Sequence, residues 1–339
     1  MRIKLYRYQL PLTMPLLIHG RSVAMREGFY VQIEQHWGEI APPLHADMKA
    51  VEQDLTAAVT RLRQGRPHGA QWSAVQFGLD CAQFKVSHTP SLVGQTASLP
   101  LSLPLLEGPR DPLLRAWRCR RVHPNRAWLS LTGDVHYDAS LVRELCLLAP
   151  TVRLVLDAAG RLGSTQILDL WSRIDARRID WLLDASGELT AAQALAEQHS
   201  IPLAFDLARY PNVIATNGFN SASGFTSPRA SDLVKADLKQ TEVVNLALSK
   251  LTFARAIILR PAALGGLAHN QMLATQARAF GLEVMVGDSL QTGLGQQQLA
   301  HLSSQWLGDA PLALGRCRYL LESGIDELGQ PKMTGLTPL

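Results

Sequence analysis

Lysine is scarce in this chain of 339 residues, and one long stretch has none at all. The sequence contains 26 arginines but only 7 lysines, and no lysine lies between Lys85 and Lys235. Arginine stays protonated in proteins, whereas a buried lysine can lose its proton near neutral pH. Residues 86–234 therefore cannot supply a lysine as a general base.

Paired cysteines, nucleotide-binding loops and long apolar runs are missing as well. The four cysteines show no C-x-x-C spacing, which argues against a zinc site and against a disulfide framework. Neither G-x-x-x-x-G-K-[ST] nor a complete G-x-G-x-x-G occurs, so a nucleotide site is disfavoured. No run of about 18 apolar residues is present, and the first ten residues carry charges. We therefore expect a cytoplasmic protein with no membrane partner.

The net charge of +4 is modest for a chain of this length. One cluster of arginines could attract an anionic partner, but a run of charges on one element is usually a solvated face. No interleaved aromatic residues and no known nucleic-acid motif accompany it, so we expect no nucleic-acid partner. The cluster consists of Arg115, Arg118, Arg120, Arg121 and Arg126.

Residues 1–98 have the pattern of a small α+β domain. Apolar residues alternate near Ile3 and again near Phe29, which predicts two antiparallel strands. Two amphipathic helical patterns follow, and then a linker from Ser87 to Pro100 that is rich in Ser, Thr, Pro and Gly. We expect residues 316–339 to complete this domain. The helical patterns span Met48–Leu62 and Trp72–Ala82.

Residues 99–315 alternate short apolar runs with amphipathic segments, as parallel sheets built from βα units do. The 241 residues after position 98 match the roughly 250 that a (β/α) barrel needs, but an open doubly wound sheet would show the same alternation. A polar insertion at about 207–240, rich in Asn, Ser, Gly and Pro, interrupts the rhythm. The runs are Leu101–Leu106, Ala127–Leu131, Val152–Leu156, Ile179–Leu183, Ile201–Phe205, Ala256–Leu259 and Leu282–Val286.

Carboxylates follow several of these runs. Asp157, Asp184 and Asp206 come directly after three of them, and Asp288 follows a fourth. In a barrel the C-terminal ends of the strands meet at one mouth, where grouped carboxylates suit Mg²⁺ or Mn²⁺. The competing interpretation is that each acid caps the helix that follows it.

The sequence resembles the o-succinylbenzoate synthase branch of the enolase superfamily over nearly its whole length. The resemblance implies an α+β capping domain that closes a TIM-type barrel of seven or eight βα units. It also implies an Mg²⁺ held by three acids and a dehydration of a cyclohexadiene carboxylate in menaquinone synthesis. In that family one lysine of a Lys-x-Lys pair moves the proton, and a second lysine across the pocket supports the enolate. The motifs are Trp37-Gly38-Glu39-Ile40-Ala41-Pro42-Pro43, Phe77-Gly78, Leu156-Asp157-Ala158, Asp206 after Phe205, and Arg260-Pro261.

Residue by residue, this chain departs from the family pattern. Asp157 and Asp206 match the first and third metal ligands, but the second falls on Leu183, with Asp184 beside it. The opposite lysine is replaced by Arg260, and the Lys-x-Lys strand falls on Trp128–Leu131. We expect a lysine in place of Leu131 or Leu129, together with Leu183→Glu and Arg260→Lys, to rebuild the family's set of site residues in outline.

Three functional hypotheses remain. In the first, the chain is an o-succinylbenzoate synthase-like protein whose dehydration is lost or strongly reduced and whose Mg²⁺ is weakened or absent. The alternative is a non-catalytic binding or regulatory paralogue that holds an anionic metabolite or protein. In the third, His136, which we expect in a surface loop, or a residue of the insertion replaces the base. The expected partner is a small anionic carboxylate bound by Arg260, and we also expect Asp288 and Ser289 to contact the substrate.

Overall fold

The computed structural model describes residues 1–339 apart from 19, 87–101, 211–243, 245–247, 309 and 311. The predicted linker Ser87–Pro100 therefore lies outside the described residues. So does the predicted insertion 207–240, apart from residues 207–210 at its start.

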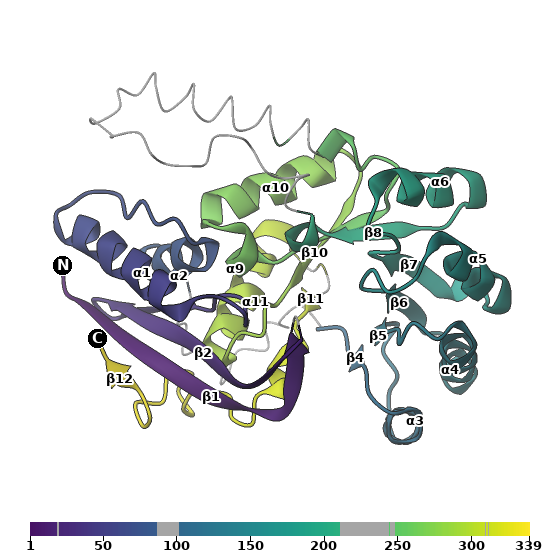
Figure 1. Ribbon diagram of the computed structural model, residues 1–339, viewed down its shortest axis with the longest axis horizontal. Coiled ribbons are helices and arrows are strands. Elements are labelled where there is room, and N and C mark those ends of the chain that lie inside the picture. The colour runs from purple at the N-terminus through teal and green to yellow at the C-terminus, as the bar shows by residue number, and fades with distance from the viewer. Residues whose placement is uncertain (19, 87–101, 211–243, 245–247, 309, 311) are drawn as a thin grey trace.

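The N-terminal part is a four-stranded sheet covered by two helices (Figure 1). The strands are ordered β12-β1-β2-β3, all antiparallel, and the last strand of the chain thus pairs with the first. Alternation places Phe29, Val31 and Ile33 on one face, where they pack against apolar residues of both helices. The bounds are β1 (Ile3–Ile18), β2 (Arg21–Ile33), β3 (His36–Ile40), β12 (Thr337–Pro338), α1 (Met48–Arg63) and α2 (Ser73–Gln83).

Eight parallel strands form the second sheet, in the sequential order β4 to β11. Its two ends meet, because Ser102 bridges Leu312 in parallel and the Leu103 amide donates to the Leu312 carbonyl at 2.7 Å. The sheet is therefore a closed barrel and not an open doubly wound sheet. The strands are β4 (Leu105–Leu106), β5 (Arg126–Ser130), β6 (Arg153–Asp157), β7 (Ile179–Leu183), β8 (Leu203–Asp206), β9 (Ala256–Leu259), β10 (Glu283–Gly287) and β11 (Leu312–Ala313).

Helices surround the barrel (Figure 1). They cover the outward faces of the strands with one large apolar cluster that includes Leu129, Leu156 and Leu182. The α-helices are α3 (Arg110–Arg118), α4 (Val135–Leu148), α5 (Ser164–Arg173), α6 (Leu189–His199), α9 (Pro261–Leu264), α10 (Leu267–Ala279) and α11 (Gly293–Leu307). Short 3₁₀ helices are η2 (Ala176–Arg178), η3 (Leu207–Arg209) and η4 (Arg316–Tyr319). Within the described parts of the chain, every helix is too short or too polar to cross a membrane.

A separate apolar cluster fills the inside of the barrel. Successive side chains of a strand point to opposite faces, so every second residue of each strand contributes to it. On β5, for example, Trp128 belongs to the inner cluster while Leu129 belongs to the outer one. The buried residues of this inner cluster are Leu103, Trp128, Val155, Trp181, Leu183, Ala204, Ala256, Ile258 and Met285.

Glu39, a fully buried residue of β3, joins the N-terminal sheet to the barrel. Its carboxylate accepts hydrogen bonds from the Tyr8 hydroxyl, the Thr292 amide and the Gly295 amide, at 2.7 to 2.9 Å. Thr292 and Gly295 begin α11, and a carboxylate is favoured at a helix N-terminus. This contact fixes the start of α11 and hence the loop that precedes it, which reaches the barrel mouth.

Candidate functional site at the barrel mouth

Three buried carboxylates gather where β6, β7 and β8 end. Asp157 and Asp206 are the last residues of β6 and β8, and Asp184 follows β7 directly. Their residues are only 4%, 1% and 1% exposed, respectively. The Asp184 backbone is left-handed, with φ of 49°, and its carboxylate accepts a hydrogen bond from the Asp206 amide at 2.9 Å. Buried carboxylates repel one another unless positive charge lies between them.

Arg209, the last residue of η3, brings positive charge to all three acids. Its Nη1 lies 2.5 Å from Oδ2 of Asp184 and 3.4 Å from Oδ1 of Asp157. Its Nε lies 3.8 Å from Oδ2 of Asp206. Arg209 was not among the site residues predicted from the sequence. The sequence feature that could have indicated it is its position three residues after Asp206. At that spacing, one turn of helix directs the side chain back towards the end of the strand.

Arg260 reaches the same group of acids from β9. Its Nε donates to Oδ2 of Asp206 at 2.5 Å, and its Nη1 donates to the backbone carbonyl of Asp288. The residue is 5% exposed, and Pro261 begins the short helix α9 directly after it. The guanidinium is thus held by two acceptors on neighbouring strands. Arg209 and Arg260 together bring Asp157, Asp184 and Asp206 into one charged cluster.

The cluster shifts the pKa values of its members in different directions. Burial raises the pKa of Asp184 to about 7, with the negative charges of Asp206 and Asp157 adding to the shift and Arg209 opposing it. Burial also disfavours the charged form of Asp206, but the guanidiniums of Arg260 and Arg209 outweigh it and lower its pKa. For Arg209, burial is outweighed by the three carboxylates, which raise its pKa. Both arginines of the cluster are therefore cations at neutral pH.

The wall that should carry the lysines is filled by other side chains. Trp128 faces the inside of the barrel, and Ser130, two residues later on the same face, pairs in register with Asp157. These two positions, and not Leu129 and Leu131, are the inward pair. The expectation that a lysine at Leu129 or Leu131 replaces the base is therefore wrong, because both leucines pack outward against the helices.

The residues do not fit a divalent metal well. Leu183 points into the barrel, is fully buried and offers no oxygen at the position of the second ligand. Oxygens of Asp157 and Asp184 instead lie within hydrogen-bonding range of Arg209. Among the described residues, no group of three or more His, Cys, Asp or Glu side chains is arranged to hold a metal ion. The ligand roles of Asp157, Asp184 and Asp206 stay predictions.

Both acids that end strands also accept hydrogen bonds from the backbone, but only Asp206 caps the helix that follows it, as the capping interpretation expected. The Asp157 carboxylate accepts from the Ala159 amide at 2.9 Å, and that of Asp206 accepts from the Ala208 amide at 3.2 Å. Each of these carboxylates uses Oδ1 for the backbone contact. Helix capping and membership of the charged cluster therefore coexist in Asp206, whereas Asp157 holds the turn that follows β6.

Two predicted substrate contacts lie on the loop after β10. The fully buried Asp288 has its carboxylate engaged by the Leu290 amide, the Gln296 side chain and the Arg316 amide, at 2.9 to 3.3 Å. Its hydrogen bonds thus secure the loop and the start of η4. Ser289 differs, because its hydroxyl oxygen is buried and has no hydrogen-bond partner among the described residues. Its hydroxyl is available to a ligand or a water molecule.

A small cavity separates Arg260 from Arg316 at the mouth. Its volume is about 20 Å³, which is room for one water-sized group. The positive charge of Arg260, together with burial, lowers the pKa of Arg316. An anion bound between the two guanidiniums would offset the repulsion between their positive charges. The lining residues are Leu103, Leu105, Trp128, Arg260, Ala313, Gly315 and Arg316.

His136 is exposed, and it lies in the first turn of α4 instead of the expected loop. Asp134 caps this helix, its carboxylate accepting from the Tyr137 amide at 3.0 Å. The helix begins here because the buried Asp138 also accepts from the Thr132 amide. His136 thus contributes no group to the buried acid cluster in the described structure.

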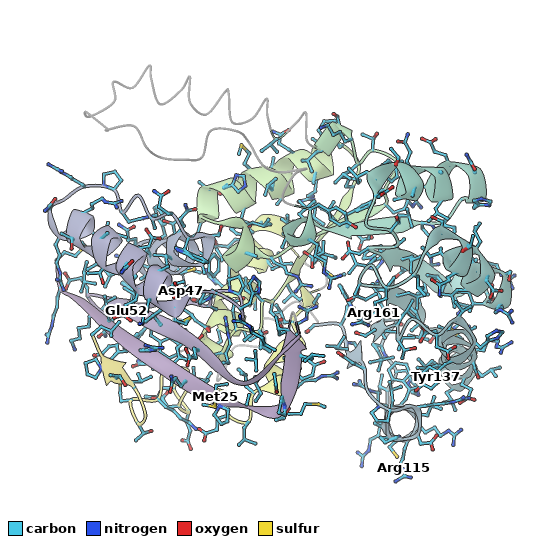
Figure 2. The ribbon with its side chains drawn as sticks, in the orientation of Figure 1. Met25, Asp47, Glu52, Arg115, Tyr137 and Arg161 are labelled. Carbon is cyan, nitrogen blue, oxygen red and sulfur yellow. The ribbon has the colours of Figure 1, made fainter. Side chains whose placement is uncertain are left out.

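One member of the predicted arginine cluster stands apart from the other four. Arg115 is exposed on the outer helix α3 (Figure 2). Arg120 lies over the Trp117 ring, whereas Arg126 pairs with Asp180 at the opposite end of the strands. Arg126 is therefore engaged in ion pairs, whereas the other four arginines are exposed.

Comparison with known proteins agrees with this architecture. Residues 1–86 match the family described as "MenC, N-terminal domain". An o-succinylbenzoate synthase of Photorhabdus laumondii is 27% identical over 322 residues, covering 91% of this chain and 87% of that protein. The same-named protein of Proteus mirabilis is 25% identical over 317 residues, covering 90% and 86%.

Solved structures extend the comparison to the fold. An o-succinylbenzoate synthase of Thermosynechococcus elongatus, complexed with magnesium in its active site, aligns with a TM-score of 0.66 at 18% identity, covering 95% of each chain. A dipeptide epimerase of Enterococcus faecalis, complexed with Mg and a dipeptide, aligns with a TM-score of 0.69 at 11% identity, covering 99% of each chain. At such identities these structures show the shared fold, which hosts more than one reaction.

Proposed function

Because this chain is a relative of the o-succinylbenzoate synthases with the fold of the enolase superfamily, we propose that its barrel mouth binds a small carboxylate without dehydrating it. The protein is o-succinylbenzoate synthase-like, of the menaquinone-pathway type, and its standard activity is lost or strongly reduced. The cavity between Arg260 and Arg316 carries this proposal, because a buried and a half-buried guanidinium on one cavity recognise an anion.

The loss of dehydration follows from the inward positions of β5. Removal of a proton next to a carboxylate needs a base with a pKa near neutrality, and neither Trp128 nor Ser130 supplies one. Arg260, opposite them, stays protonated and already bonds Asp206. In this proposal it stabilises negative charge but moves no proton.

The size of the cavity limits the ligand. A space of about 20 Å³ has room for one water-sized group, so a carboxylate group must widen it and an aromatic ring must widen it far more. Trp128 occupies the adjoining space inside the barrel. We therefore expect short mono- and dicarboxylates to bind better than o-succinylbenzoate, whose ring would have to displace Trp128.

Calorimetric titration tests this function. Succinate and o-succinylbenzoate are titrated into the protein and into Arg316→Met, with Arg177→Met as the control because Arg177 is exposed and remote from the cavity. We expect succinate binding that is lost in Arg316→Met and kept in Arg177→Met. Equal binding in all three proteins, or none in any of them, would refute the proposed site.

A further inference from the structure

Arg209 has surroundings that are unusual for an arginine on a short loop helix. Its guanidinium contacts oxygens of Asp157, Asp184 and Asp206, which come from the ends of three successive strands. A single nitrogen, Nη1, lies within 4 Å of both Asp157 and Asp184. One cation thus stands at the point where three buried carboxylates converge.

The charges explain why such a cation is needed. Three carboxylates that are at most 4% exposed cannot all stay ionised without compensating positive charge. Arg209 and Arg260 each contact the cluster, and together they supply the charge of one divalent ion. A guanidinium also has five donors in a plane, so it can serve several carboxylates at once.

The local backbone holds Arg209 in this place. Asp206 caps η3 through the Ala208 amide, so the acid that Arg209 approaches also starts the turn that carries it. The next residue, Tyr210, packs edge-on against Phe205 and donates its hydroxyl to the Ser186 carbonyl at 2.9 Å. The turn is thus secured on both sides of Arg209.

We propose that Arg209 is a built-in cation that replaces a divalent metal at the barrel mouth, so that Asp157, Asp184 and Asp206 are held together without a bound ion. The side chain is a positioning residue for the acids and for Arg260. The ligand cavity is thereby kept independent of magnesium. This inference deepens the proposed carboxylate site but stands apart from it, because metal and carboxylate binding are measured separately.

The decisive variant is Arg209→Ala, with Arg161→Ala as its control. Arg161 is another exposed arginine near the mouth (Figure 2), and it donates to the Leu131 carbonyl instead of contacting the acids. The melting temperature of the full chain is measured in EDTA and then in increasing concentrations of MnCl₂. Binding of Mn²⁺ is measured separately, as the decrease in the electron paramagnetic resonance signal of the free ion. Stabilisation by a bound ion grows with its concentration relative to Kd.

We expect the melting temperature of the native protein to be the same in EDTA and in MnCl₂. Arg209→Ala should melt at a lower temperature in EDTA, and Mn²⁺ should restore part of the loss because the acids then need another cation. Adding Asp157→Asn to Arg209→Ala should abolish that rescue, whereas Arg161→Ala should show neither the loss nor the rescue. Rescue by Mn²⁺ separates a replacement for the metal from a purely structural arginine.

Two results would overturn the inference. One is Mn²⁺ binding by the native protein that Asp157→Asn removes, since the acids would then hold a metal beside Arg209. The other is an Arg209→Ala protein that is destabilised but gains no stability from Mn²⁺, alone or combined with Leu183→Glu to supply the missing oxygen. Neither result depends on whether succinate binds, so failure of the carboxylate proposal remains distinguishable.

Discussion

Arg260, which directly follows β9, forms a buried ion pair with Asp206 at the end of the neighbouring strand β8, with 2.5 Å between Nε and Oδ2. Arg260 stands where the family resemblance placed a lysine, and Asp206 where it placed a metal ligand. The pair therefore joins two positions that the family's chemistry keeps separate. An arginine bound to the acid neutralises it and cannot act as a base.

Removal of the cation from this pair should destabilise the fold. We expect Arg260→Met to lower the free energy of unfolding by about 3–5 kcal/mol, because Asp206 would lose a buried partner. Arg260→Lys should cost less, since an ammonium can still approach Asp206 while the hydrogen bond to the Asp288 carbonyl is lost. Urea unfolding at pH 7 measures both changes.

The double variant Asp206→Asn with Arg260→Met serves as the control. The two single changes should not add, because each removes the same interaction. A loss of less than about 0.5 kcal/mol in Arg260→Met would instead mark the pair as energetically neutral, like an ordinary surface substitution.

The register of β5 makes a prediction about lysine substitutions. Ser130→Lys should fold with little loss of stability, because position 130 is half-buried and its ammonium would lie beside Asp157. Leu129→Lys should lower the free energy of unfolding by about 3–5 kcal/mol, since it places an unpaired charge in the outer apolar core. Urea midpoints of the two proteins decide the matter. Equal losses would mean that the inward and outward faces have been assigned incorrectly.

Asp184 gives the stability a particular dependence on pH. Its pKa is raised by burial from 3.8 to about 7, so between these values the folded protein binds a proton that the unfolded chain has released. The free energy of unfolding should therefore fall as pH rises from about 4 to 7 and level off above that range. Asp184→Asn removes the titrating group and should flatten this part of the curve.

Asp169→Asn is the matched control for that experiment. Asp169 is an exposed acid on α5 that pairs with Arg173. Urea unfolding from pH 4 to pH 8 should show the same curve for this variant as for the native protein. A native curve that rises over this range, with Asp184→Asn parallel to it, would contradict the raised pKa.

The barrel was predictable from sequence because its strands are buried on both faces. Such strands appear as continuous apolar runs, and each fully described run coincides with an observed strand to within a few residues. Helix α11 was not predicted, because fully buried polar residues interrupt its apolar pattern. Gln298, for example, donates to the Trp37 carbonyl at 2.8 Å instead of packing against apolar atoms. Strand β11 has two residues and is too short to give a pattern.

The candidate site was only partly accessible to sequence reasoning. Asp157, Asp206 and Arg260 could be named because each follows an apolar run. The role of Arg209 could not, because it depends on a 3₁₀ turn directing the side chain back across three strands. The cavity beside Arg316 likewise depends on how η4 folds over the barrel. Residues that directly follow a strand could be predicted from the sequence. Contacts made by side chains on the short helices η3 and η4 could be seen only in the structure.

Helix α2 approaches β3 closely at Gly78, so we expect that substitution of this glycine by a larger residue destabilises the fold. A Cβ on Gly78 would lie 2.5 Å from Cγ1 of Ile40 and 2.7 Å from the Glu39 carbonyl oxygen. Gly78→Ala should therefore lose about 1–3 kcal/mol, although alanine favours helices. Gly187→Ala, with no atom within 4 Å of its added Cβ, should be close to neutral in the same unfolding assay. An equally stable Gly78→Ala would contradict this packing.

The residues on the inward face of β5 should determine whether the protein catalyses the dehydration. General acid–base catalysis contributes about 10²- to 10⁴-fold, and loss of a group that serves as both base and acid removes both proton transfers. Ser130 and Trp128 replace that group, and Leu183 supplies no oxygen to a metal. With the cyclohexadiene substrate, formation of o-succinylbenzoate followed by absorbance should be undetectable or several orders of magnitude slower than in a lysine-containing relative assayed in parallel, even at high Mg²⁺. Steady turnover that EDTA and Asp157→Asn both abolish would show instead that another residue acts as the base and that the acids bind a metal.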